Sequence, residues 1–232
     1  MAIPLYFALT DAEFQAADPL PERIAWMACH FSAYGTGLSN LPPALPPKSL
    51  LILNDRIPVA GHDPKQICRE LKEAAQINEC AGIILDFQRP DCADTVNIVK
   101  EVLSLPIPVV VSDRYAKELG CPVLLSPPPL HKPLEEYLSP WTSRDIWLEA
   151  ALGHTDITVT PTGSAIQELL LERTVGAFRD DSLFCHYHVQ ITDTEAVFSL
   201  QRNSDDLRKL LERSEQLGVS VAVGLYQELK GI

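Results

Sequence analysis

The chain has 232 residues, 46% of them hydrophobic, which suffices for one barrel-sized domain or two small ones and excludes a disordered chain. Its formal net charge of −12 argues against a nucleic-acid or anionic-membrane partner. No apolar run approaches the roughly 18 residues of a membrane-spanning helix, and the N-terminus lacks the basic and apolar segments of a signal peptide. We therefore expect a soluble, cytoplasmic protein.

The first half of the sequence alternates apolar strand patterns with helical patterns. The predicted elements are a strand over 3–9, a helix over 12–34 that prolines break early, a proline-rich connection over 35–47, a strand over 49–54, a helix over 63–78, a strand over 81–88, a helix over 92–103, and strands over 109–113 and 123–126. Repeats of this kind imply parallel strands with right-handed crossovers. Either an α/β fold of the (β/α) TIM-type barrel kind or a doubly wound sheet is consistent with them.

The second half interrupts this alternation with antiparallel elements. The predicted elements are a short helix over 135–138, paired strands over 145–152 and 155–160, a helix over 165–172, a hairpin over 184–191 and 196–200, a helix over 203–217 and a last strand over 219–225. We expect one domain over residues 1–232 with β-hairpin insertions, because the elements before the proline-rich connection could not bury a core alone.

Residues 81–88, with the sequence AGIILDFQ, predict a buried strand that ends in two polar side chains. Because side chains alternate along a strand, Ile84, Asp86 and Gln88 share one face, and the other face is apolar. The C-terminal ends of parallel strands form active sites in barrels, so Asp86 and Gln88 are the first functional candidates. The alternative is that Asp86 only caps a neighbouring loop or helix.

The same eight residues resemble the motif Asp-Gly-x-Asp-x-Asp-x-Glu of family-18 glycoside hydrolases, the chitinase family. Gly82 and Asp86 match the motif, Ala81 and Ile84 replace its first two aspartates, and Gln88 replaces the glutamate that is the general acid. The resemblance implies a barrel with a degenerate catalytic motif, because an amide has no proton to donate. In the family the last aspartate helps the substrate's acetamido group to act as the nucleophile, and Asp86 alone cannot perform that sequence.

The end of the chain resembles the close of the same barrel, with a hairpin, a serine-led helix and a strand that follows Gly218. In the family this strand carries a tryptophan that forms the floor of the sugar subsite, and here Ala222 or a nearby small residue replaces it. Alternation along this strand places Ala222 and Gly224 on one face with Tyr226 and Glu228. We expect this face to point into the barrel, with Tyr226 and Glu228 at its mouth.

Trp147 and Glu149 share the face of the 145–152 strand that lies opposite its apolar side. We expect this face to line the barrel interior, where desolvation beside an indole would raise the pKa of Glu149 and suit it to general acid catalysis. The alternative is that Glu149 pairs with an arginine such as Arg144 or is exposed on a hairpin.

The candidate residues are predicted to converge on one acidic, partly aromatic depression. The catalytic candidates are Asp86 and Glu149, and the ligand-binding candidates are Tyr6, Gln88, Trp147, Tyr226 and Glu228. Such a depression suits a neutral sugar or small polyol, and a cationic ligand as well.

We expect no cofactor and no metal. His186 and His188 share a strand face, but no third ligand has a telling spacing, so a solvated hairpin face is our interpretation. The sequence has no phosphate-binding glycine loop and no His-Glu-x-x-His motif. The six cysteines form no Cys-x-x-Cys pair and are typical of reduced core thiols, although an even number would also allow disulfides.

Three functions are consistent with these observations. The first is a non-catalytic or altered relative of family-18 glycoside hydrolases that binds a carbohydrate-like ligand. The second is an active glycan-processing hydrolase that uses Asp86 and Glu149 as its acidic pair. The third is a structural or assembly protein that retains only the barrel. The oligomeric state is left open.

Overall fold

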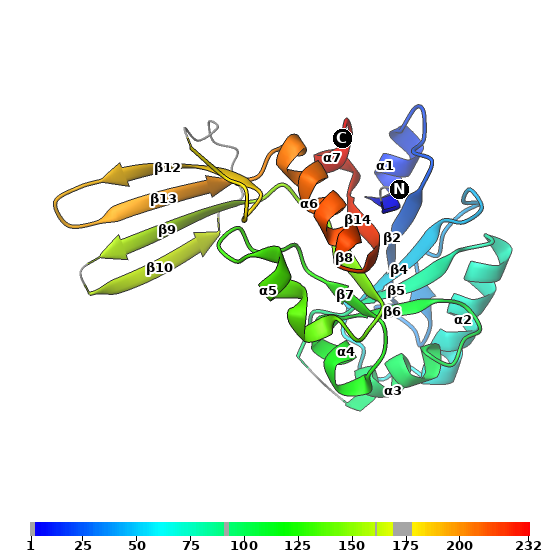
Figure 1. Cartoon of the computed structure of the whole chain (residues 1–232). Helices are drawn as coiled ribbons and strands as arrows, with labels where there is room; N and C mark the ends of the chain where they lie inside the picture. The colour runs from blue at the N-terminus through cyan, green and yellow to red at the C-terminus, as the bar shows by residue number, and fades with distance from the viewer. Residues whose placement is uncertain (1–2, 91–92, 161, 169–177) are drawn as a thin grey trace.

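The computed structural model describes residues 3–90, 93–160, 162–168 and 178–232. In this part of the chain, eight parallel strands form a closed barrel, because the first strand pairs with both the second and the last (Figure 1). Around the barrel the strands are β1 (Leu5–Leu9), β2 (Ile24–Phe31), β4 (Leu50–Asn54), β5 (Gly82–Asp86), β6 (Val109–Ser112), β7 (Val123–Leu125), β8 (Ile146–Glu149) and β14 (Val219–Leu225). The prediction of a TIM-type barrel is confirmed, and a doubly wound sheet is excluded.

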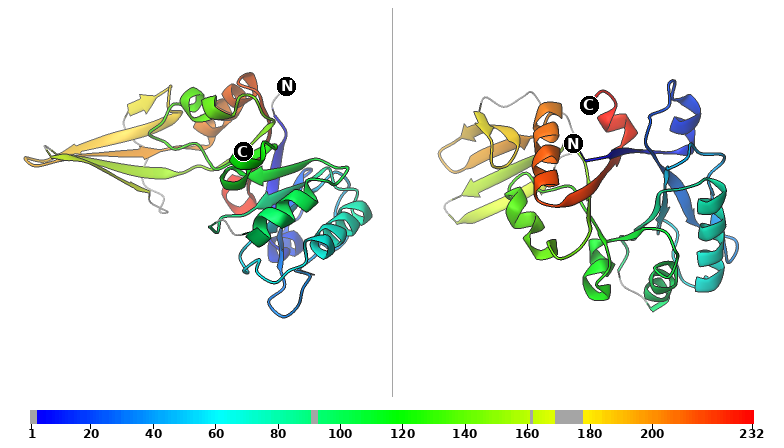
Figure 2. Two further views of the ribbon diagram at one scale, coloured as in Figure 1. Left: turned by 90° about the horizontal axis from the view of Figure 1, so that it is seen from below. Right: turned by 45° about the vertical axis from the view of Figure 1, so that its right-hand side comes forward.

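Helices follow most of the barrel strands, and the longer ones cover the outside of the barrel (Figures 1 and 2). They are α1 (Asp11–Ala16), α2 (Pro64–Ile77), α3 (Ala93–Val102), α4 (Asp113–Leu119), α5 (Leu134–Leu138), α6 (Ser204–Gln216) and α7 (Tyr226–Leu229), with a 3₁₀ turn at Ser139–Trp141. The predicted helix over 63–78 is α2, which Asp63 caps by accepting a hydrogen bond from the backbone N–H of Lys65, and Pro64 occupies its first turn.

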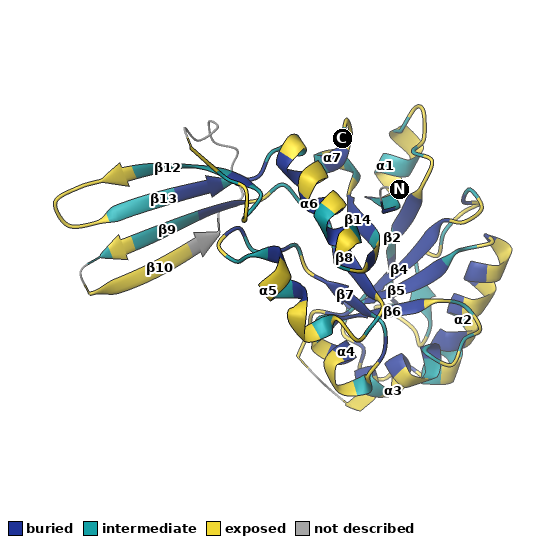
Figure 3. Ribbon diagram, viewed as in Figure 1, coloured by how far each residue is buried: buried dark blue, intermediate teal, exposed yellow. Residues whose placement is uncertain are grey.

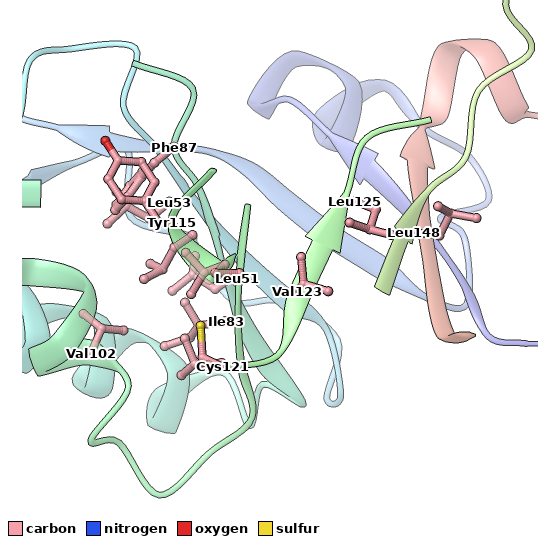
Figure 4. Packing of buried hydrophobic residues seen from close by; sticks show 14 of the residues in the cluster. Leu51, Leu53, Ile83, Phe87, Val102, Tyr115, Cys121, Val123, Leu125 and Leu148 are labelled. Atoms are coloured by element: carbon pink, nitrogen blue, oxygen red, sulfur yellow. The ribbon is translucent and has the colours of Figure 1, made fainter. Parts of the chain in front are cut away.

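Side-chain alternation along the strands divides the core into two layers. Leu50, Ile84 and Trp147 point into the barrel and belong to one buried cluster. Their strand neighbours, such as Leu51 and Ile83, point outward and pack against the helices (Figure 4). The strands are consequently buried on both faces, and the exposed residues of the helices lie on their outer sides (Figure 3).

A second, antiparallel sheet projects from the barrel between β8 and α6 (Figures 1 and 2). Its strand order is β10 (Gly163–Glu168), β9 (His154–Thr160), β13 (Ala196–Gln201), β12 (Cys185–Ile191) and β11 (Phe178–Asp180). The buried guanidinium of Arg202 joins this sheet to the barrel by donating hydrogen bonds to the carbonyls of Pro128, Leu183 and Phe184. The predicted hairpin over 184–191 and 196–200 corresponds to β12 and β13 and is confirmed.

The predicted helix over 12–34 is wrong beyond residue 16. After α1 and a proline-containing turn, β2 forms over Ile24–Phe31. The second barrel strand was missed because its sequence, IAWMACHF, is apolar on both faces, and such a run cannot be distinguished from a buried helix by periodicity. A two-residue strand, β3 (Leu38–Ser39), then pairs antiparallel with β2.

Two further predictions in the second half are corrected. The predicted pairing of 145–152 with 155–160 does not occur, because β8 pairs in parallel with β7 and β14, whereas β9 belongs to the projecting sheet. The chain leaves the barrel through Gly153, whose φ of 81° favours glycine. The predicted helix over 165–172 is strand β10 as far as Glu168, and residues 169–172 lie outside the described residues.

Candidate functional site

A pocket of about 250 Å³ opens at the C-terminal end of the barrel. Its floor is formed by apolar interior residues of the barrel strands, among them Ile52, Ile84 and Val223. Four polar side chains line it, namely Asn54, Asp86, Glu149 and Glu228. Among the described residues, no lysine, arginine or histidine contributes to its lining. The pocket is therefore apolar at its base and acidic around its sides.

Asp86 is the last residue of β5 and follows Ile84 on the interior face, as the alternation predicts. The Gln88 amide donates a hydrogen bond of 2.6 Å to one of its carboxylate oxygens. Burial raises the pKa of Asp86, the hydrogen bond from Gln88 lowers it, and the nearby charge of Asp55 raises it. Gln88 itself is exposed and does not line the pocket, so it acts on the pocket through Asp86.

Glu149 is the last residue of β8, and its side chain lines the same pocket as Asp86. Burial raises the pKa of Glu149 to about 7, and the negative charges of Asp86 and Asp113 add to this shift. The carboxyl group forms no hydrogen bond or ion pair with another described residue. Arg144, the expected partner, donates instead to the carbonyls of Ala116, Lys117 and Cys121. At neutral pH the group therefore exchanges a proton readily, which is the property required of a general acid or base.

The other two polar lining residues are held by the backbone. The Asn54 amide donates to the carbonyls of Met27 and Cys29, at 3.1 and 3.0 Å, where the pairing of β2 with β4 is irregular. Glu228, in α7, accepts a hydrogen bond from the backbone N–H of Leu152 just after β8. Both residues therefore line the pocket and also hold the backbone segments at its rim in place.

The turn after β5 is fixed by Asp55, whose side chain is buried. Its two carboxylate oxygens accept hydrogen bonds from the backbone N–H groups of Gln88 and Arg89, at 3.1 and 2.7 Å. The Arg89 side chain donates hydrogen bonds to the carbonyls of Asp55 and Arg56. This arrangement sets the position from which Gln88 reaches Asp86.

The three aromatic candidates do not line the pocket. Tyr6 packs against the interior cluster, and Trp147 lies within it, 5% exposed, with its indole N–H directed to Asp145 at the start of β8. Tyr226 packs edge-to-face against Phe7, with ring centroids 6.2 Å apart. The side chains on the interior face of a strand are distributed along the whole length of the barrel. Trp147 and Glu149 therefore share this face without both lying at the mouth.

The faces of the last strand differ from the prediction. Val221 and Val223 point into the barrel, and Ala222 is buried in the outer layer. An irregularity in the pairing of β14 with β8, between Val219 and Val221, shifts the alternation by one residue. Gly224 still borders the pocket, and a side chain added there would collide with Leu229 and the carbonyl of Ala150.

Sequence reasoning missed Asn54, Asp55 and Asp113 as contributors to the site. Each lies at the C-terminal end of a barrel strand, as Asp86 does, so the same argument applied to β4 and β6 would have found them. Tyr137 was also missed, and it donates a hydrogen bond of 2.8 Å to the carbonyl of Ser126. Burial and the charges of Asp113 and Glu149 raise the pKa of its hydroxyl.

The described residues contain no group of three or more His, Cys, Asp or Glu side chains placed to hold a metal ion. Nδ1 of His186 lies 2.7 Å from a carboxylate oxygen of Asp206, at the root of the projecting sheet. The cysteines in the described part of the chain are free thiols. None of the described helices is long and apolar enough to cross a membrane.

No protein-family model matches the chain, and no curated protein sequence matches it either. Solved structures do resemble it. A chitinase-like agglutinin from Robinia pseudoacacia superposes with a TM-score of 0.57 at 11% sequence identity, covering 94% of this chain and 93% of that one. The spore cortex-lytic enzyme SleL from Bacillus cereus superposes with a TM-score of 0.55 at 9% identity, covering 98% of this chain and 73% of that one. The protein therefore has a chitinase-like glycoside hydrolase fold.

Proposed function

We propose that the protein binds a carbohydrate-like ligand in the pocket at the barrel mouth and does not hydrolyse chitin-type glycans. The observation that carries this proposal is an open pocket at the C-terminal end of the barrel, with Asp86, Glu149 and Glu228 around it. Carboxylates accept hydrogen bonds from hydroxyl groups, and the apolar floor suits the C–H surface of a sugar ring.

The size of the pocket indicates how much of a ligand it would hold. About 250 Å³ lies just below the ~300–1,000 Å³ of typical small-molecule sites. One ring fits such a space, and the opening allows further units to extend into solvent. A hollow mouth also disfavours the structural or assembly function, for which filling side chains would be the expected arrangement.

The proposed absence of hydrolysis rests on Gln88. Its amide replaces the general acid of the family-18 motif and donates a hydrogen bond to Asp86 instead. A neutral amide cannot protonate a departing glycosidic oxygen. The Robinia pseudoacacia protein, a chitinase-like barrel that is named an agglutinin, offers an analogy at the level of the fold.

A screen of monosaccharides and short glycans by thermal shift tests the binding proposal. A ligand present at 100 times its dissociation constant should stabilise the folded state by about 2.7 kcal/mol. The double variant Asp86→Asn/Glu149→Gln should lose the shift, whereas Asp193→Asn/Glu195→Gln, in the exposed β12–β13 turn, should retain it. If no glycan stabilises the wild-type protein, the proposed function is wrong.

A second candidate function is favoured by one observation, the pKa of Glu149 of about 7 beside Asp86. Glu149 would be partly protonated near neutral pH, and its protonated form would donate the proton to the leaving oxygen, with Asp86 as the second carboxylate. A fluorogenic chito-oligosaccharide assay separates the two functions. Turnover that survives Gln88→Ala and disappears in Asp86→Asn and in Glu149→Gln would establish the hydrolase in place of the binding protein.

A further inference from the structure

The geometry points to a ligand that presents a protonated amine to the pocket, so that among sugars the ligand is a free amino sugar rather than an N-acetylated one. This inference rests on the proposed function and concerns the chemical group that faces the carboxylates. It follows from the charges, the hydrogen-bond donors and the hydrogen-bond acceptors that line the pocket.

The charge inside the pocket is uncompensated. Asp86, Glu149 and Glu228 line it from three different elements, β5, β8 and α7. No basic side chain among the described residues lines it. The side chain of Arg89 donates its hydrogen bonds to the carbonyls of Asp55 and Arg56. Carboxylates that approach one another in a partly desolvated space repel, so a cation that enters gains interaction with each of them.

The lining side chains offer acceptors but no spare donors when the carboxylates are ionised. Both hydrogens of the Asn54 amide are directed to the backbone carbonyls of Met27 and Cys29. Asp86 accepts from the amide of Gln88, which does not itself line the pocket, and Glu228 accepts from a backbone N–H. The second oxygen of Asp86 and both oxygens of Glu149 have no hydrogen bond to another described residue.

An ammonium group matches this arrangement better than its neutral counterparts. It supplies three donors and a positive charge, whereas the carbonyl oxygen of an acetamido group needs a donor that the ionised side chains do not provide. A hydroxyl group can donate only one hydrogen bond, without the charge. The described residues contain no group of three or more His, Cys, Asp or Glu side chains placed to hold a metal ion, so an organic cation that spans the pocket fits better.

Binding of the cation should also depend on pH. The titratable groups around Glu149 are Asp86 from β5, Asp113 from α4 and Tyr137 from α5, which interact with it electrostatically, and Glu228 from α7, which lines the same pocket. The pKa of Glu149 is raised to about 7, so the group is largely protonated at pH 5 and must release its proton to pair with a cation. Affinity for the amine should therefore fall as the pH is lowered from 7 to 5, by up to about tenfold per unit.

The test compares matched ligands by isothermal titration at pH 7. The probes are glucosamine and galactosamine, their N-acetylated forms, the parent hexoses, and cyclohexylamine as a ring amine without hydroxyl groups. Because a hydrogen bond to a charged group contributes about 1.5–3 kcal/mol, the amino sugars should bind about tenfold or more tightly than their N-acetylated and hydroxyl partners. Glu149→Gln should remove most of this preference, and Glu195→Gln, which deletes the same charge far from the pocket, should retain it.

The outcomes separate this inference from the proposed function. Equal affinity for an amino sugar and its N-acetylated form, or a preference that survives Glu149→Gln, overturns the inference while the sugar-binding proposal stands. Binding of cyclohexylamine without binding of any sugar supports the cation-binding pocket and overturns the proposed function. A preference for amino sugars that weakens at pH 5 and disappears in Glu149→Gln supports both.

Discussion

The two ends of the barrel interior are built from the same rows of side chains but differ in packing. At the N-terminal end, Trp147 fills the space beside Gly82, where an added Cβ would lie 3.3 Å from the indole ring. Two residues further along β8, Glu149 borders a hollow pocket. One strand therefore contributes packing at one end and an ionisable group at the other.

This difference shows how a barrel separates stability from function. Substitutions in the filled end should reduce the free energy of unfolding, because close packing leaves no room for relaxation. Substitutions of Asp86 and Glu149 in the hollow end should act on binding and on the pH dependence of stability, because these carboxylates are incompletely paired. Four predictions test the contrast.

The largest expected effect is that of Trp147→Ala. Removing a buried indole from the filled end should lower the free energy of unfolding by about 3–5 kcal/mol, measured by chemical denaturation. Trp141→Ala is the matched control, because Trp141 is only half-buried, and should cost less. Equal losses in the two variants would mean that the interior is not closely packed at this end.

Glu149→Gln should alter how stability depends on pH. The folded pKa of Glu149 is raised from 4.5 to about 7, so the wild type carries no ionisation penalty below pH 4.5 and progressively loses stability as the pH rises to 7. The full loss is about 3 kcal/mol. The variant should lack this loss, so that its stability relative to the wild type is greater at pH 8 than at pH 4.5.

Unfolding curves for both proteins at the two pH values provide the measurement. Glu195→Gln, in an exposed turn, should follow the wild type at each pH. A wild type whose stability is unchanged between pH 4.5 and 7 would show that Glu149 is well solvated in the folded state.

Asn54→Ala should have an intermediate effect, because it leaves the carbonyls of Met27 and Cys29 without their donor at the pocket rim. The expected loss of stability is about 1–3 kcal/mol. Asn54→Asp retains the acceptor for the backbone N–H of Arg56 but not the donor, so it should destabilise at least as much. If Asn54→Asp were as stable as the wild type, the bonds to β2 would contribute little.

Gln88→Glu should produce no chitinase activity, the smallest effect of the four. A general acid contributes about 10²–10⁴ in rate only when it is tuned and positioned. Ala81 and Ile84 still replace the two aspartates of the motif, and the new carboxylate would lose the 2.6 Å hydrogen bond to Asp86 and repel it. Hydrolysis of a fluorogenic chito-oligosaccharide by this variant would show that the rest of a catalytic site is intact. A lower melting temperature of the variant would report the repulsion between the two carboxylates.

The sequence by itself determined which residues share a strand face. Alternation predicted that Asp86 follows Ile84 and that Glu149 follows Trp147 on a common face, and the structure places all four on the interior side. Caps and turns are equally local, so Asp63 and the 184–200 hairpin were predictable. These features depend on neighbours within a few residues, which the sequence displays directly.

The tertiary structure alone decided the partners of each strand and the chemistry of the pocket. A run that is apolar on both faces did not reveal β2, and the irregular pairing in β14 reversed the faces of Val221 and Ala222. Asp55 meets the backbone of Gln88 from 33 positions earlier in the chain, and Glu149 acquires its raised pKa from burial and from Asp86 across the barrel. Pairing register and desolvation arise from residues far apart in sequence that are brought together only when the barrel closes.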